Sequence, residues 1–146
     1  MMELLPNSMS FRVINSIDLT PDDDIPPRFT GRIRRTFANE QRSVAWHTDG
    51  QLDDPGRGVP AYRLYRANGR VKYEMHYSAG LLADPDASTP AVRGFYADGV
   101  VHYEERYTDG RRQDGGLGEA AVRKWRADGT LRHELRYHRG VRIPAK

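Results

Sequence analysis

Three segments of 30 residues follow one another without a gap: DPGRGVPAYRLYRANGRVKYEMHYSAGLLA (54–83), DPDASTPAVRGFYADGVVHYEERYTDGRRQ (84–113) and DGGLGEAAVRKWRADGTLRHELRYHRGVRI (114–143). Eight positions are identical in all three copies; in the first copy they are Asp54, Ala61, Arg63, Ala67, Gly69, Glu74, Tyr77 and Gly80. An aromatic residue also recurs, as Tyr65, Phe95 and Trp125. Self-similarity at a fixed period of this length indicates a repeat architecture, in which each copy is one supersecondary unit.

Each copy has the pattern of a β-hairpin. Residues 61–66 alternate and are rich in β-forming side chains, and a second alternating run covers 71–77. Between the two runs stands Asn68-Gly69, or Asp-Gly in the other copies, which is the strongest short-range signal of a hairpin turn. The stretches that join the copies are rich in Asp, Pro, Gly and Ser, as loops are. The pattern predicts an all-β chain of antiparallel hairpin repeats that form a continuous meander or open sheet.

The turn allows two registers. A two-residue loop at Asn68-Gly69 places Arg63 opposite Glu74, whereas a three-residue loop that includes Ala67 and ends in a glycine bulge places Tyr65 opposite Val71. A slip of one residue moves every side chain to the other face. We favour the three-residue loop because it separates apolar from charged side chains. It predicts one face with Ala61, Tyr65, Val71, Tyr73, Met75 and Tyr77, and an opposite face with Arg66, Lys72, Glu74 and His76. The recurring aromatic residues are expected to fill the core between hairpins.

The repeat pattern weakens toward the N-terminus. Residues 31–53 form a degenerate copy, since Gly50 stands 30 residues before Gly80. This gives a repeat domain over 31–146 and a short irregular N-terminal segment over 1–30, which is partly disordered or contributes an edge strand. Within that segment, FRVINSI (11–17) is the candidate strand, PDDDIPP (21–27) has the composition of a linker, and residues 1–10 are expected to be disordered.

The pattern Arg-x-aromatic-x-x-(Asn/Asp)-Gly-x-(Val/Leu)-x-x-Glu-x-x-Tyr-x-x-Gly resembles the MORN-type repeat, and is closest to the bacterial variant of antitoxin-type repeat proteins. The resemblance covers residues 54–142 and extends weakly over 31–53. The period of 30 is longer than the usual unit. The tyrosine-aspartate repeats of bacterial surface toxins share part of the pattern, with a spacing that fits less well. The MORN-like resemblance implies a small extended β-meander that binds proteins or membrane surfaces and catalyses nothing.

Composition excludes several classes of chemistry. There is no cysteine, so disulfides, thiolate catalysis and thiolate zinc sites are excluded. No apolar run approaches the roughly 20 residues that span a bilayer, and no signal-peptide pattern is present, so a cytoplasmic location is expected. The sequence contains no nucleophile elbow, P-loop or dinucleotide fingerprint. Among the five histidines, only His133 and His138 are closely spaced, which does not predict a metal site. We therefore expect a protein without catalytic activity and without a cofactor or metal.

Charge suggests where a partner binds. The chain has 23 Lys and Arg against 20 Asp and Glu, and 20 of the cations are arginine. Net charge is +3 over 54–83, −2 over 84–113 and +3 over 114–143. Basic copies around an acidic one suit a patterned protein surface better than a phosphate backbone. We predict a protein partner with acidic patches, bound in an antitoxin-like or inhibitory manner; the alternative is single-stranded nucleic acid bound by the arginine-rich face. The candidate contact residues are Arg66, Lys72, His76, Tyr96, Arg106, Arg126, Arg132 and Arg136.

Overall fold

The computed structural model describes residues 2–7 and 10–144, with side chains described from Asn15 onward. The described residues form strands and turns and contain no helix, as predicted for an all-β chain. The strands are β1 (Met2–Asn7), β2 (Ser10–Leu19), β3 (Gly31–Thr36), β4 (Arg42–Thr48), β5 (Gln51–Leu52), β6 (Tyr62–Tyr65), β7 (Val71–Met75), β8 (Tyr77–Ser78), β9 (Leu81–Leu82), β10 (Val92–Phe95), β11 (Val101–Glu105), β12 (Tyr107–Thr108), β13 (Arg111–Arg112), β14 (Val122–Trp125), β15 (Leu131–His138) and β16 (Val141–Ile143).

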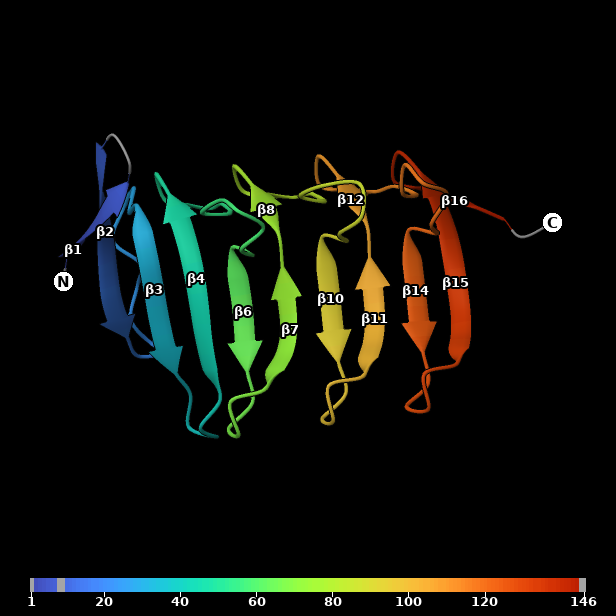
Figure 1. Ribbon diagram of the computed structural model, residues 1–146, viewed down its shortest axis with the longest axis horizontal. Helices are drawn as coiled ribbons and strands as arrows, with labels where there is room; N and C mark the ends of the chain where they lie inside the picture. The colour runs from blue at the N-terminus through green and yellow to red at the C-terminus, as the bar shows by residue number, and fades with distance from the viewer. Residues whose placement is uncertain (1, 8–9, 145–146) are drawn as a thin grey trace.

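These strands build one long open sheet (Figure 1). Its order is β1-β2-β3-β4-β6-β7-β10-β11-β14-β15-β16, and β5 pairs with the end of β4. Neighbouring strands run antiparallel, except that β2 and β3 are parallel. Two small two-stranded sheets, β8–β9 and β12–β13, extend from one end of the hairpins. In the part of the chain that the structure describes, no second layer covers either face, so both faces of the sheet meet solvent.

The N-terminal segment extends the sheet. The predicted strand at 11–17 lies within β2, which pairs in parallel with β3 through Ser16–Leu19 and Arg32–Arg35. Residues 2–7, where we expected disorder, form β1 at the outer edge. Residues 1 and 8–9 lie outside the described residues. Among the residues described, no helix has the length and apolar character that crossing a bilayer requires.

The predicted three-residue turn is confirmed. The Arg66 N–H donates to Arg70 O at 2.7 Å and the Gly69 N–H donates to Arg66 O at 2.8 Å. Gly69 has a φ of +88°, a left-handed conformation that glycine adopts without a Cβ penalty. Tyr65 accordingly lies opposite Val71, and the other two copies repeat this pairing as Phe95–Val101 and Trp125–Leu131.

A second irregularity, which the sequence analysis missed, brings the other pairing back. The register shifts by one residue between Leu64 and Tyr65, because Lys72 has no residue opposite it. Beyond this bulge Arg63 lies opposite Glu74, so both proposed pairings occur in the same hairpin. An extra residue in one strand turns the side chains that follow it to the other face. The predicted single apolar face is therefore wrong.

The bulge divides the expected apolar residues between two faces. Tyr73 and Met75 share one face with Tyr62 and Leu64, while Tyr65 shares the other with Arg63 and Glu74. The recurring aromatic residues Tyr65, Phe95 and Trp125 are half-buried and do not form the interior that we expected. A single-layer sheet buries few apolar side chains, and most of those that it buries are small. Among the described residues they are Ile33, Ala45, Ala61, Leu64, Ala91, Val92, Ala120, Ala121 and Val122.

One aspartate in each copy holds the hairpin to the loop that precedes it. Asp84 Oδ1 accepts the N–H of Ala91 at 2.8 Å and of Tyr107 at 3.0 Å, and Oδ2 accepts Arg106 Nη1 at 3.3 Å. Asp54 and Asp114 make the same backbone bonds in their copies. Burial raises the pKa of Asp84, and the hydrogen bonds it accepts act in the opposite direction. We call this arrangement the aspartate latch.

Replacing Asp84 by Ala should destabilise the sheet by about 3 kcal/mol, because two backbone N–H groups and a buried guanidinium lose their acceptor. Equilibrium urea unfolding measures the effect. Asp86→Ala is the matched control in the same loop, since Asp86 is exposed and its Oδ1 atom accepts the Ser88 N–H and hydroxyl at 2.9 Å. We expect that control to change stability much less than Asp84→Ala does. Equal losses in the two variants would contradict a special role for the latch.

His47 is a buried histidine whose titration should affect folding. Its side chain is 7% exposed, and its Nδ1 atom has no hydrogen-bond partner among the described residues. Burial lowers the pKa of His47 below the ordinary 6.5, and the nearby charge of Arg35 lowers it further. The folded protein therefore favours the neutral imidazole.

This depressed pKa predicts a loss of stability in mild acid. Below about pH 6.5 the unfolded chain takes up a proton at this position more readily than the folded protein does, so the free energy of unfolding falls as the pH drops through that value. His47→Gln, which does not titrate, should show a smaller fall between about pH 7.5 and 5.5. Urea unfolding at several pH values measures both slopes, and identical slopes would show that His47 does not contribute.

Candidate functional site

Three of the eight candidate contact residues belong to the aspartate latch. His76, Arg106 and Arg136 occupy the same position in successive copies, and each contacts the latch aspartate, at 2.7, 3.3 and 3.3 Å. His76 is only 3% exposed and Arg106 only 5%. The interpretation of these two as surface positions is therefore wrong, whereas Arg136 in the last copy is exposed.

Three more candidates occupy one equivalent position, and two of them connect one copy to the next. Arg66 Nη2 donates to the carbonyl of Phe95 at 2.9 Å, and the Tyr96 hydroxyl donates to the carbonyl of Trp125 at 2.7 Å. The equivalent residue of the last copy, Arg126, turns back and donates to Leu131 O in its own hairpin at 3.0 Å. Arg66 and Tyr96 therefore act first as ties between hairpins.

The remaining two candidates, Lys72 and Arg132, stand at the bulge of the first and last copies. Lys72 is half-exposed and Arg132 exposed, and within the described residues neither makes an ion pair or hydrogen bond. The eight predicted residues thus lie in three different surroundings, and the structure does not bring them together in one site.

One face of the sheet carries a row of alternating charges. The residues directly opposite one another, strand after strand, are Arg63, Glu74, Arg93, Glu104, Arg123 and Glu134. Within each hairpin the arginine and glutamate form an ion pair, at 2.9, 2.7 and 3.2 Å. We call this row the charge ladder. Opposite charges placed across from each other stabilise neighbouring strands, so these cations are already neutralised.

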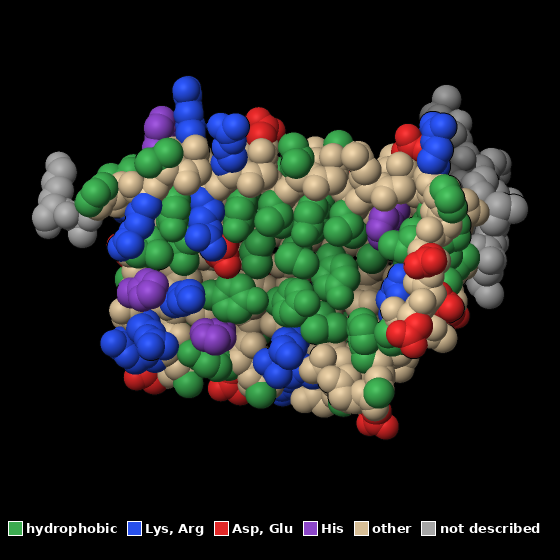
Figure 2. Space-filling model, turned by 180° about the vertical axis from the view of Figure 1, so that it is seen from behind, with side chains coloured by type: hydrophobic (Ala, Val, Ile, Leu, Met, Phe, Trp, Pro, Cys, Tyr) green, Lys and Arg blue, Asp and Glu red, His purple; other side chains and the backbone are tan. Residues whose placement is uncertain are grey.

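The other face carries tyrosines. Tyr62, Tyr73 and Tyr103 lie on it, on β6, β7 and β11, together with Met75. The Tyr62 and Tyr73 rings stack with centroids 6.0 Å apart, and the Tyr103 ring occupies the space that a side chain at Gly94 would need. We call this the tyrosine face, and Figure 2 shows hydrophobic side chains gathered across its middle strands. The sequence analysis placed Tyr73 on an apolar face but did not place Tyr62 there. The signal available for Tyr62 was that it directly precedes Arg63, so the two side chains point to opposite faces of the strand.

Four tyrosines near this face keep their hydroxyl protons over the physiological range of pH. Burial, helped by the neighbouring Tyr62, raises the pKa of Tyr73 to about 12. Burial also raises the pKa of Tyr77, Tyr103 and Tyr107. Their hydroxyl groups are therefore neutral donors and acceptors on half-buried rings, which is the combination that protein interfaces favour.

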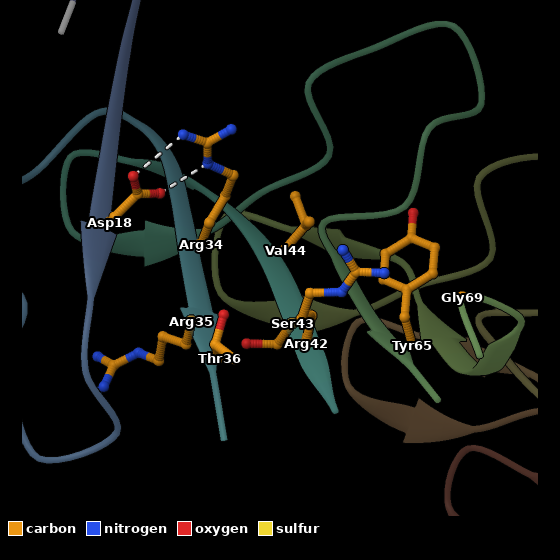
Figure 3. A pocket seen from close by; sticks show the side chains of 9 residues that line it. All are labelled: Asp18, Arg34, Arg35, Thr36, Arg42, Ser43, Val44, Tyr65 and Gly69. Atoms are coloured by element: carbon orange, nitrogen blue, oxygen red, sulfur yellow. Dashed lines mark hydrogen bonds and ion pairs between the residues drawn. The ribbon is translucent and has the colours of Figure 1, made fainter. Parts of the chain in front are cut away.

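A hollow of about 640 Å³ opens near the N-terminal end of the charge ladder (Figure 3). Arg34 lines one side, where its Nε atom donates to Asp18 at 2.7 Å, and Arg42 with Tyr65 lines the other. Val44 lies between them. Arg42 is exposed and makes no ion pair or hydrogen bond within the described residues. The hollow can receive an acidic side chain of a partner beside an apolar contact.

Metal chemistry finds no support in the arrangement of ligands. Among the described residues, no three His, Asp or Glu side chains are grouped in a way that could hold a metal ion.

Comparison with known proteins found no protein-family model, no curated protein and no solved structure that matches the chain.

The latch explains how position 76 should respond to substitution. His76→Arg installs the residue that the other two copies use against their aspartates, so we expect the free energy of unfolding to change by less than about 1 kcal/mol. His76→Leu leaves the Asp54 carboxylate without its partner at 2.7 Å and should cost about 2–3 kcal/mol. Urea unfolding compares the two variants. If leucine were tolerated as well as arginine, the contact with Asp54 would not be stabilising.

Proposed function

We propose that this chain is a non-enzymatic protein-binding module, and that the tyrosine face is its main contact surface. The observation that carries the proposal is a single-layer sheet whose half-buried tyrosines have no second layer over them in the described residues. Tyrosine is enriched where protein interfaces carry most of their binding energy, because it combines a large apolar ring with a polar group. A partner that covers this face supplies the missing layer.

The state of the cations favours a protein over nucleic acid. Many arginines that a phosphate backbone would need are paired with carboxylates: Arg34, Arg63, Arg93, Arg106, Arg112, Arg123 and Arg136. The charge ladder also presents Glu74 and Glu104 between its arginines, and these would repel a phosphate chain laid across the sheet. A protein surface can match an alternating row of charges residue by residue.

The MORN-like resemblance of residues 54–142 supports the same class of function. It suggests an antitoxin-like role, in which the module binds and inhibits a toxin-like protein in the cytoplasm, without a cofactor. The free cations Arg42, Lys72 and Arg132 suit acidic patches at the margins of such a contact. The repeat itself accounts for an extended surface, since each hairpin adds one more segment of both faces.

Two tyrosines of the first hairpin provide a matched test of the tyrosine face. Tyr73→Lys places a charge on it, whereas Tyr65→Lys makes the same exchange on the opposite face, which Tyr65 shares with Arg63 and Glu74. The immobilised chain is used to capture a partner from the source organism, and calorimetry then measures the affinity of the purified partner. We expect Tyr73→Lys to weaken binding by at least about tenfold and Tyr65→Lys to change it less than about threefold.

Circular dichroism and thermal unfolding confirm that both variants fold, and Tyr103→Lys repeats the test at a second position of the same face. Loss of affinity in Tyr65→Lys alone would assign the contact to the charge ladder face instead. Fluorescence anisotropy with single-stranded and duplex DNA and RNA at about 0.15 M salt tests the alternative function. Submicromolar binding that Arg132→Ala and Arg136→Ala abolish would replace the protein partner by nucleic acid.

A further inference from the structure

We propose that the outer edge of β15, residues 131–135, is the docking site for an extended segment of a protein partner. The segment adds to the sheet as an antiparallel strand and places an arginine opposite Glu134. This inference rests on the proposed protein-binding function and names a second place of contact, separate from the tyrosine face.

The interior of the sheet shows what such a junction consists of. Where one hairpin meets the next, the backbone N–H of Trp46, His76 or Arg106 donates to the carbonyl of Ala61, Ala91 or Ala121, each at 2.7 Å. The strands then continue in register, so that Glu74 faces Arg93 and Glu104 faces Arg123. Every interior glutamate of the charge ladder therefore has an arginine on both sides.

The edge of β15 has the same construction with one side open. Glu134 pairs with Arg123 on β14, and in the described residues no strand lies opposite residues 131–135 on the other side. The side chain of Glu134 is 37% exposed, against 16% for both Glu74 and Glu104. The charge ladder thus ends on a glutamate that has a vacant place for one more cation.

The edge also has a side-chain hydrogen-bond donor, Arg126, which could bond to an added strand. Arg66 and Tyr96 each donate to a backbone carbonyl of the next hairpin, at 2.9 and 2.7 Å. Arg126 stands at the equivalent position and is exposed, and it bonds back to Leu131 O. A strand added at this edge would bring a carbonyl within reach of Arg126 in the same way. Main-chain hydrogen bonds give affinity in strand addition, and alternate side chains give specificity.

The interior junction and the local charges define the chemistry of the partner segment. At the first junction Met75, Glu74 and Tyr73 face Val92, Arg93 and Gly94, so the segment needs an apolar residue, an arginine and a small residue in that order. Two residues before Glu134 the edge carries Arg132, which makes no ion pair within the described residues, whereas Arg136 already pairs with Asp114 at 3.3 Å. An acidic residue two positions after the partner's arginine completes the match, giving apolar-Arg-small-acidic.

The same charges disfavour a second copy of this chain as the occupant. Arg126 and Arg132 outnumber Glu134 along the edge, so two such edges brought together would repel each other. The partner segment that we infer avoids this repulsion, because it places an arginine opposite Glu134 and an acidic residue beside Arg132.

The test uses the full chain and a labelled peptide, PAVRGEY, which follows residues 90–96 with glutamate in place of Phe95. Fluorescence anisotropy should show saturable binding, and Glu134→Gln should weaken it about tenfold. Glu104→Gln is the matched control, because Glu104 has the same role inside the sheet, and it should leave the affinity unchanged. Replacing the peptide arginine by glutamine should remove the difference between Glu134→Gln and the wild type.

A second variant tests the backbone contact. Arg132→Pro removes an N–H on the strand edge, where proline is tolerated, and should abolish binding of every peptide version. Absence of peptide binding, or equal effects of Glu134→Gln and Glu104→Gln, would overturn the proposal. So would a doubled mass in light scattering that Arg132→Pro restores to the monomer value, since a second copy would then occupy the edge. If the captured partner binds Arg132→Pro normally but not Tyr73→Lys, the protein-binding function stands and the edge proposal falls.

Discussion

The hydrogen bonds of one carboxylate per copy determine how the hairpins are arranged. Asp54, Asp84 and Asp114 each accept the N–H of the alanine just before the first strand and the N–H of a tyrosine 23 residues further on, which follows β7 and β11 and lies within β15. Both strands of a hairpin are thereby fixed to one loop. The alanine bound by the aspartate also accepts the N–H of the preceding hairpin, so the same residue joins neighbouring copies. The small apolar core of a single layer makes these polar contacts more important than they are in a two-layer domain.

Much of the local structure could be predicted from the sequence, because it depends on short-range chemistry. The Asn-Gly and Asp-Gly pairs locate each hairpin turn, and the three-residue loop is one of the two forms that they allow. The bulge at Lys72 leaves no comparable mark, since no glycine or proline stands there. That one residue decides whether Tyr73 lies with Tyr65 or with Tyr62. Local patterns therefore gave the hairpin but assigned its faces incorrectly.

The candidate site was harder to predict for a related reason. Arg and His are usually exposed, and only contact with an aspartate about 22 residues earlier explains the burial of His76 and Arg106. The charge ladder likewise joins residues of different copies, and its order follows from the register of whole hairpins. The sequence does show the repetition itself. Equivalent residues of the copies have the same surroundings in the sheet, and they differ where a copy has no neighbouring hairpin.

The two ends of the sheet differ in how they stop. At the N-terminal end β3 meets the parallel strand β2, followed by β1, and neither belongs to a hairpin of the repeat. That change of direction and pattern ends the ladder of interior contacts, and Val44 stands where a further charged residue would continue it. At β15 the interior pattern is unaltered: Glu134, Arg126 and Arg136 hold the positions that elsewhere engage another hairpin. Exposed apolar side chains accompany them at Leu131, Val141 and Ile143. An edge that keeps the complete chemistry of a junction is a template for a strand, and the charges along it decide which strand fits.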